Sequence, residues 1–111
     1  MNAQQFVANF KADKDMAMKL YFDGEPSEVS ERIKALGLPP DKLTEIEGIV
    51  DVVLTDTYYS ILMGLEGSAS IGEDQQGYTI IDEGGTVITD SAHGDLGGYA
   101  WDAFQLDEDN N

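Results

Sequence analysis

His93 is the only histidine of the chain, and it lies in the stretch DSAHGDLGG beside Asp90, Ser91 and Asp95. A histidine next to carboxylates can act as a general base or as a metal ligand, because imidazole titrates near neutral pH. Members of a catalytic triad meet by folding, however, so nearness along the chain does not define one. The glycines and polar residues around His93 predict an exposed turn, and we assign no catalytic residue.

Adjacent carboxylates offer oxygen ligands to a hard cation such as Ca²⁺. Two such pairs are present, Glu73–Asp74 and Asp82–Glu83. The alternating acids, central glycine and closing glutamate of a calcium-binding loop are absent, and the stretch that begins with Asp13 and Asp15 turns apolar where further ligands are required. We therefore predict no dedicated metal site.

The glycines of GLEGSASIG match neither a dinucleotide fingerprint nor a phosphate-binding loop, and no lysine follows them. Cysteine is absent, which excludes disulfides and thiolate nucleophiles. We predict no cofactor. The remaining enzyme interpretation is a small hydrolase or metal-dependent enzyme that uses carboxylates and His93. That interpretation lacks a cationic electrophilic group, because no Lys or Arg follows Lys42.

Charge is distributed very unevenly along the 111 residues, whose formal net charge is −16. Residues 1–42 hold six basic and seven acidic residues, whereas residues 43–111 hold fifteen acidic residues and no basic one. This sign argues against direct binding to nucleic acid, which requires Lys and Arg against phosphate, and against anionic membrane surfaces. The start MNAQQFVANF lacks the features of a signal peptide, and no uninterrupted apolar run approaches the ~20 residues that span a bilayer. We expect a cytoplasmic protein and no membrane partner.

Three interpretations of the acidic half are open. Acidic surfaces improve solubility without any further role. Adaptation to salt also produces them, although it should acidify the whole chain, and residues 1–42 are almost balanced. The functional interpretation is a face that docks onto a cationic site and steers the encounter.

The docking interpretation assigns the binding site to acidic residues of the second half and to two aromatic residues. Tyr59 lies on the polar side of its helix and Trp101 precedes Asp102. An aromatic residue surrounded by acids is typical of an interface hot spot. The predicted site residues are Glu73, Asp74, Asp82, Glu83, Asp90, Asp95, Tyr59 and Trp101.

In size and charge alone, the chain is similar to small acidic bacterial and phage proteins that plug nuclease or nucleic-acid-binding grooves. Toxin-immunity proteins and phosphate-mimicking anti-defence proteins are of this kind. The similarity implies a non-enzymatic inhibitor whose partner is a basic protein: a nuclease, a toxin or a nucleic-acid-binding protein. The oligomeric state stays open.

Apolar periodicity and turn residues predict an α+β fold with three to four helices and an antiparallel β-hairpin or small sheet, in the order ααα-β-β-α. We expect one domain over residues 1–106 and an acidic, disordered tail over 107–111. The predicted helices are 2–22, with a break near Asp13 left open, then 26–36, 41–65 and a last one that Asp90 or Asp95 caps. The predicted strands are 69–71, 78–81 and 86–89.

The segment 41–65 shows the longest helical pattern and should be the spine of the core. Burial of each large apolar side chain on its stripe stabilises the fold by about 1.5–3 kcal/mol before entropy. Polar residues, including Asp51 and Thr55, fall on the other side. The predicted core stripe is Ile46, Ile49, Val50, Val53, Leu54, Thr57, Tyr58, Ile61, Leu62 and Leu65.

Overall fold

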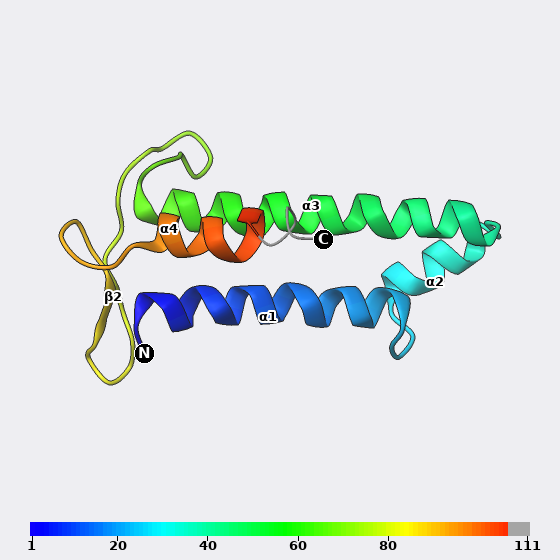
Figure 1. The fold of residues 1–111 in the computed structure, drawn as a ribbon, viewed down its shortest axis with the longest axis horizontal. Coiled ribbons are helices and arrows are strands. Elements are labelled where there is room, and N and C mark those ends of the chain that lie inside the picture. Colours follow the sequence, from blue (N-terminus) through cyan, green and yellow to red (C-terminus); the bar gives the residue numbers. More distant parts are fainter. Residues whose placement is uncertain (107–111) are drawn as a thin grey trace.

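The computed structural model describes residues 1–106, and the predicted tail at 107–111 lies outside them. Within that range the chain forms four α-helices, a short π-helical segment and a two-stranded antiparallel hairpin (Figure 1). The order ααα-β-β-α and the α+β class confirm the prediction. In chain order the elements are α1 (Ala3–Phe22), α2 (Glu28–Ala35), α3 (Pro40–Glu66), β1 (Ile80–Ile81), β2 (Val87–Thr89), α4 (Leu96–Trp101) and η1 (Asp102–Leu106).

The helices begin and end at residues that satisfy their terminal backbone groups. The side chain of Asn2 accepts a hydrogen bond from the Gln5 N–H at 2.8 Å, and α1 then continues through Asp13 without a break. Helix α2 begins two residues later than predicted, because Ser27 caps it. Helix α3 ends at Gly67, whose φ of 97° is the left-handed conformation that glycine adopts readily.

The hairpin is shorter than the sequence predicts. Ile80 pairs with Thr89 and Ile81 with Val87, with an irregularity between the two pairs. Gly85 occupies the turn at a φ of 90°, which favours glycine. The predicted strand at 69–71 does not form, because its only β-type pairing among the described residues is an isolated bridge at Ile71.

The arrangement is elongated, with extents of 50 × 31 × 27 Å. Helices α1 and α3 run antiparallel, α2 connects them at one end, and the hairpin lies at the other (Figure 1). Helix α3 has 27 residues and is therefore about 40 Å long, whereas α4 has six and spans about 9 Å. Helix α4 packs against both long helices near the hairpin end, so it covers only the C-terminal part of α3.

The hydrophobic core therefore lies near the hairpin. The Tyr58 ring stacks on Phe104, with centroids 6.1 Å apart, and meets the edge of Phe10 at 5.9 Å. Burial raises the pKa of the Tyr58 hydroxyl, and the Asp13 carboxylate raises it further. The buried apolar residues come from α1, α3, β2, α4 and η1: Ala3, Val7, Leu62, Ile88, Leu96, Ala100 and Phe104.

The predicted core stripe is correct for Leu62 and for the partly buried Tyr58 and Leu65, and wrong for several residues in both halves of α3. Leu62 is fully buried, but Ile49, Val53 and Ile61 are 58%, 54% and 42% exposed. Thr55, predicted to face solvent, is buried, and Asp51, also predicted to face solvent, is half-buried beside Lys14 of α1. The reason is the side of α3 that its neighbours cover: α1 meets Asp51, and periodicity identifies apolar positions without saying which side a neighbouring element covers.

The contact between α1 and the N-terminal half of α3 is polar. Lys14 of α1 is only 5% exposed, and its Nζ lies 2.7 Å from Oδ1 of Asp51. Thr55, one turn further along α3, is 3% exposed. The side of α3 that faces α1 is thus the one that carries Asp51, and the apolar side that carries Ile49 points elsewhere.

Candidate partner-binding surface

Three segments gather at the hairpin end of the molecule: the loop 67–79, the hairpin 80–89 and the loop 90–95 (Figure 1). They carry all six carboxylates that the sequence assigned to the binding site, and no Lys or Arg occurs among residues 67–95. Four of the six basic residues lie towards the opposite end of the molecule: Lys19, Arg32, Lys34 and Lys42. The uneven charge of the sequence thus becomes an uneven charge along the 50 Å axis.

Asp82 has a structural role in the hairpin. Its Oδ1 accepts a hydrogen bond from the Thr86 N–H at 2.9 Å, and its Oδ2 lies 3.1 Å from the amino group of Met1. The first of these bonds closes the turn between β1 and β2. The second ties the start of α1 to the hairpin.

Asp90 and Asp95 also organise the backbone around them. Asp90 Oδ1 accepts from the Ala92 N–H at 2.8 Å and from the His93 N–H at 2.7 Å. Asp95 caps α4, because its Oδ1 accepts from the Gly98 N–H at 3.1 Å. Of the two predicted caps, the helix therefore uses Asp95, and Asp90 shapes the preceding turn.

Glu73, Asp74 and Glu83 differ from those three carboxylates. Their residues are exposed, and none of them forms an ion pair within the part of the chain that the structure describes. The backbone of Asp74 pairs with Ile71, which holds the loop, but its side chain is left to solvent. These three carboxylates are the ones at the hairpin end that are free to meet a partner.

We expect the side chains of Asp82 and Asp90 to titrate below the ordinary aspartate value of 3.8. The Thr86 N–H is the main cause that lowers the pKa of Asp82, and the Ala92 N–H is the main cause for Asp90. A folded-state pKa below the unfolded one stabilises the fold above the unfolded value, and this contribution disappears as the pH falls through the folded pKa. Side-chain carboxyl NMR titration between about pH 2 and pH 6 measures both values. Values at or above 3.8 would show that the turn hydrogen bonds do not persist in solution.

Among the described residues, the contact of His93 with Asp90 is the side-chain arrangement that resembles catalytic machinery. Its Nδ1 lies 2.9 Å from Asp90 Oδ1 and 3.1 Å from Oδ2, so the carboxylate orients the ring. The side chain is 73% exposed. Within residues 1–106, no group of three or more His, Cys, Asp or Glu side chains lies close enough to hold a metal ion.

Tyr59 and Trp101, the two predicted aromatic anchors, are in contact. Their ring centroids are 6.4 Å apart with the planes at 65°, an edge-to-face geometry. Trp101 is 50% exposed and joins α4 to the side of α3. This pair lies where α4 ends, on the flank of the helices, whereas the predicted carboxylates lie at the hairpin end. The structure therefore divides the predicted residues between two places.

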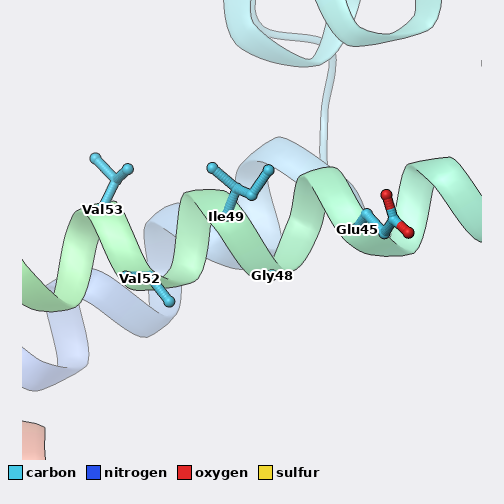
Figure 2. A pocket seen from close by; sticks show the side chains of 5 residues that line it. All are labelled: Glu45, Gly48, Ile49, Val52 and Val53. Carbon is cyan, nitrogen blue, oxygen red and sulfur yellow. The ribbon is translucent and has the colours of Figure 1, made fainter.

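A further surface escaped the sequence analysis. Glu45, Gly48, Ile49, Val52 and Val53 line a shallow, open hollow on the N-terminal half of α3 (Figure 2). The sequence signal was Val52, which is apolar but lies off the predicted stripe. Apolar residues therefore lie on more sides of α3 than the one that its neighbours cover.

By length and composition alone, α3 is also apolar enough to cross a membrane, a criterion that core helices of soluble proteins satisfy too. Asp51 and Asp56 lie near the middle of this helix, however, and a carboxylate at the centre of a bilayer is unfavourable by about 2.5–3.5 kcal/mol.

Comparison with protein families, curated proteins and solved structures finds no match for this chain. Fold and surface together define a small, strongly acidic α+β protein.

Proposed function

We propose that this chain is a non-enzymatic acidic binding protein that docks onto a basic protein and inhibits it, in the manner of a toxin-immunity or nucleic-acid-mimicking anti-defence protein. One observation carries the proposal: three exposed carboxylates without ion pairs, Glu73, Asp74 and Glu83, gather with three others at an end that has no Lys or Arg. Uncompensated like charges oppose folding, and a cationic partner relieves that repulsion on binding.

The partner supported by this arrangement is a protein with a cationic groove, such as a nuclease, a toxin or a nucleic-acid-binding protein. Carboxylates at one end of an elongated molecule steer that end towards such a groove and raise the association rate. Asp82, Asp90 and Asp95 add to the field while they hold the loops in shape. The free carboxylates therefore stand on turns whose geometry is already set before the partner arrives.

The second candidate is a small hydrolase, and the contact between His93 and Asp90 favours it. An acyl-transfer or hydrolytic site also needs a nucleophile and a group that stabilises developing negative charge. Because residues 43–111 contain no Lys or Arg, backbone amides or a bound metal would have to supply that group. The anionic surroundings would oppose a developing oxyanion, so we rank the binding function first.

Neutralisation of the free carboxylates should weaken partner binding and spare the fold. We expect the variant Glu73→Gln, Asp74→Asn, Glu83→Gln to keep or slightly raise its melting temperature. Its affinity for a basic partner captured from the native cell should fall by about tenfold, because each rim charge contributes little and the loss falls mainly on the association rate. Stopped-flow association rates at several salt concentrations measure this, and the salt dependence should become flatter. Asp82 is left intact because it closes the hairpin turn.

A matched control removes the same charge from the other end of the molecule. Asp23→Asn, Glu25→Gln and Glu47→Gln change three exposed residues far along the chain from the hairpin. This control should bind with nearly the rate of the unmodified protein. Equal losses of association rate in both variants would show that the net charge of the protein, and not the position of the carboxylates, causes the effect. No loss in either variant, with lower solubility, would favour the solubility interpretation. A captured partner that is cleaved or modified, with the activity abolished by His93→Ala, would favour the hydrolase.

A further inference from the structure

The N-terminal half of α3 has an apolar side that no described part of the chain covers. Asp51 faces α1 through Lys14, and the side chains around the hollow lie on the other side of the helix. Ile49, Val52 and Val53 are each more than half exposed. In Figure 2, Ile49 and Val53 project from one side of α3, whereas Gly48 and Val52 lie on the opposite edge of the hollow. A contiguous exposed apolar patch of this kind commonly marks an interaction site.

Gly48 lies at one edge of this side, inside a regular helix, about 100° around the helix axis from Ile49. A β-carbon built on it would meet nothing within 4 Å, and its φ is not positive, so neither crowding nor backbone conformation within the chain requires glycine here. Glycine in a helix interior is less stable than alanine. Small residues allow two helix backbones to approach closely. The position therefore suits the close approach of another helix.

The charges on this side of α3 are self-complementary. Lys42 is seven residues before Ile49 and Asp56 is seven residues after it. Positions seven apart in a helix stay on nearly one line, with a drift of about 20° per heptad. The Lys42 Nζ lies 3.6 Å from the carboxylate of Glu45, which lines the hollow, and Asp56 is exposed with no ion pair within residues 1–106. Along this side the Lys42–Glu45 ion pair comes first, then the apolar centre, then the anionic Asp56.

We propose that this face binds α3 of a second copy of the chain, with the two helices antiparallel and the twofold axis at Ile49. Each Lys42 then lies opposite Asp56 of the second copy, so two ion pairs flank an apolar centre of Ile49, Val52 and Val53. A parallel pair would set Lys42 against Lys42 and Asp56 against Asp56. The interface is isologous, the commonest symmetry among homo-oligomers.

The antiparallel arrangement also reconciles association with the net charge of −16. Seventeen residues separate Ile49 from Glu66, where α3 meets the hairpin end, a distance of about 25 Å. The two anionic ends therefore point in opposite directions and lie roughly 50 Å apart, far beyond the ~8 Å screening length of physiological salt. Both hairpin ends stay free for the proposed basic partner.

Sedimentation equilibrium or light scattering tests the dimer. At about 0.15 M salt, we expect a reversible monomer–dimer equilibrium between about 5 and 500 µM chain. Ile49→Asp should be monomeric throughout, with the circular dichroism and low-concentration melting temperature of the unmodified chain. Met16→Asp changes an exposed apolar residue of α1, 66% exposed, and should dimerise normally. A wild-type chain that stays monomeric at about 500 µM would overturn the proposal.

Charge exchange tests the antiparallel register. Lys42→Glu and Asp56→Lys should each weaken the dimer by at least about tenfold, because each change sets like charges together at both ends of the interface. The double variant restores opposite charges in that register and should return to within about threefold of the original affinity. If the double variant is weaker than both single variants, the register is wrong.

Gly48→Ala distinguishes an effect on the contact between the two α3 helices from an effect on the stability of α3 itself. It should raise the melting temperature of the dilute monomer and weaken the dimer, because the added methyl group stands beside Val52 at the edge of the contact. A stronger dimer would contradict the proposed approach. Sedimentation with vesicles of mixed neutral and anionic lipid is the second control: binding of monomers to vesicles, without dimers in solution, would assign the face to lipid. Either failure leaves the proposed function intact, because Glu73, Asp74 and Glu83 lie at the hairpin end.

Discussion

Replacement of Leu62 by alanine should lower the free energy of unfolding by about 2–5 kcal/mol, the usual cost of a large-to-small change in a core. Leu62 is fully buried where α1, α3, α4 and η1 meet. Leu62 belongs to the same buried cluster as Phe104, on which the Tyr58 ring stacks. Thermal and guanidinium denaturation measure the loss, which should exceed about 10 °C in melting temperature.

The matched control is Ile49→Ala, on the same helix. Ile49 is 58% exposed, so its truncation should change stability by no more than about 0.5 kcal/mol in dilute protein. Together, Leu62→Ala and Ile49→Ala show which side of α3 the rest of the chain covers. If Ile49→Ala destabilised the monomer as much as Leu62→Ala, the apolar side that carries Ile49 would be the covered one, and both the fold and the proposed dimer face would be wrong.

The ion pair between Lys14 and Asp51 provides the second large effect. Asp51→Leu should lower the free energy of unfolding by about 1–3 kcal/mol, because it leaves the ammonium group of a nearly buried lysine without its carboxylate. The lower end of that range allows for Asp51, whose side chain is 40% exposed and partly screened by water. Guanidinium denaturation at neutral pH measures it.

The double variant decides whether the loss comes from the unpaired charge. Lys14→Met together with Asp51→Leu removes both charges and should restore stability to within about 1 kcal/mol of the original, or exceed it. Asp15→Leu is the control, because Asp15 pairs with Lys11 at 3.6 Å on an exposed surface and should contribute less than about 0.5 kcal/mol. Strictly additive losses at Lys14 and Asp51 would show that the pair does not interact.

Local patterns in the sequence were sufficient for the order and type of the elements. The pattern of 41–65 defined α3 to within one residue at each end, because the prolines before it and Gly67 after it interrupt helical geometry locally. The hairpin around residues 82–85 followed from its glycines and β-branched neighbours in the same way. The prediction failed for the strand at 69–71, which found no partner strand.

For the candidate site, composition alone established the anionic half, and the six carboxylates do gather at one end. Composition could not show that Asp82, Asp90 and Asp95 are engaged by backbone N–H groups while Glu73, Asp74 and Glu83 are not. That distinction depends on hydrogen bonds over two to four residues in turns whose backbone angles the sequence does not specify.

The sequence by itself determined the helices, the hairpin and the asymmetry of charge, because each depends on neighbours within a few residues. Only the tertiary structure decided which side of α3 is covered. Apolar residues occupy several sides of that helix, and periodicity ranks them alike; the short α4 and the Lys14 ammonium then select the side that carries Asp51, Tyr58 and Leu62. Ile49, Val52 and Val53 are left in solvent because α1 packs against the side that carries Asp51 and no other described element covers theirs.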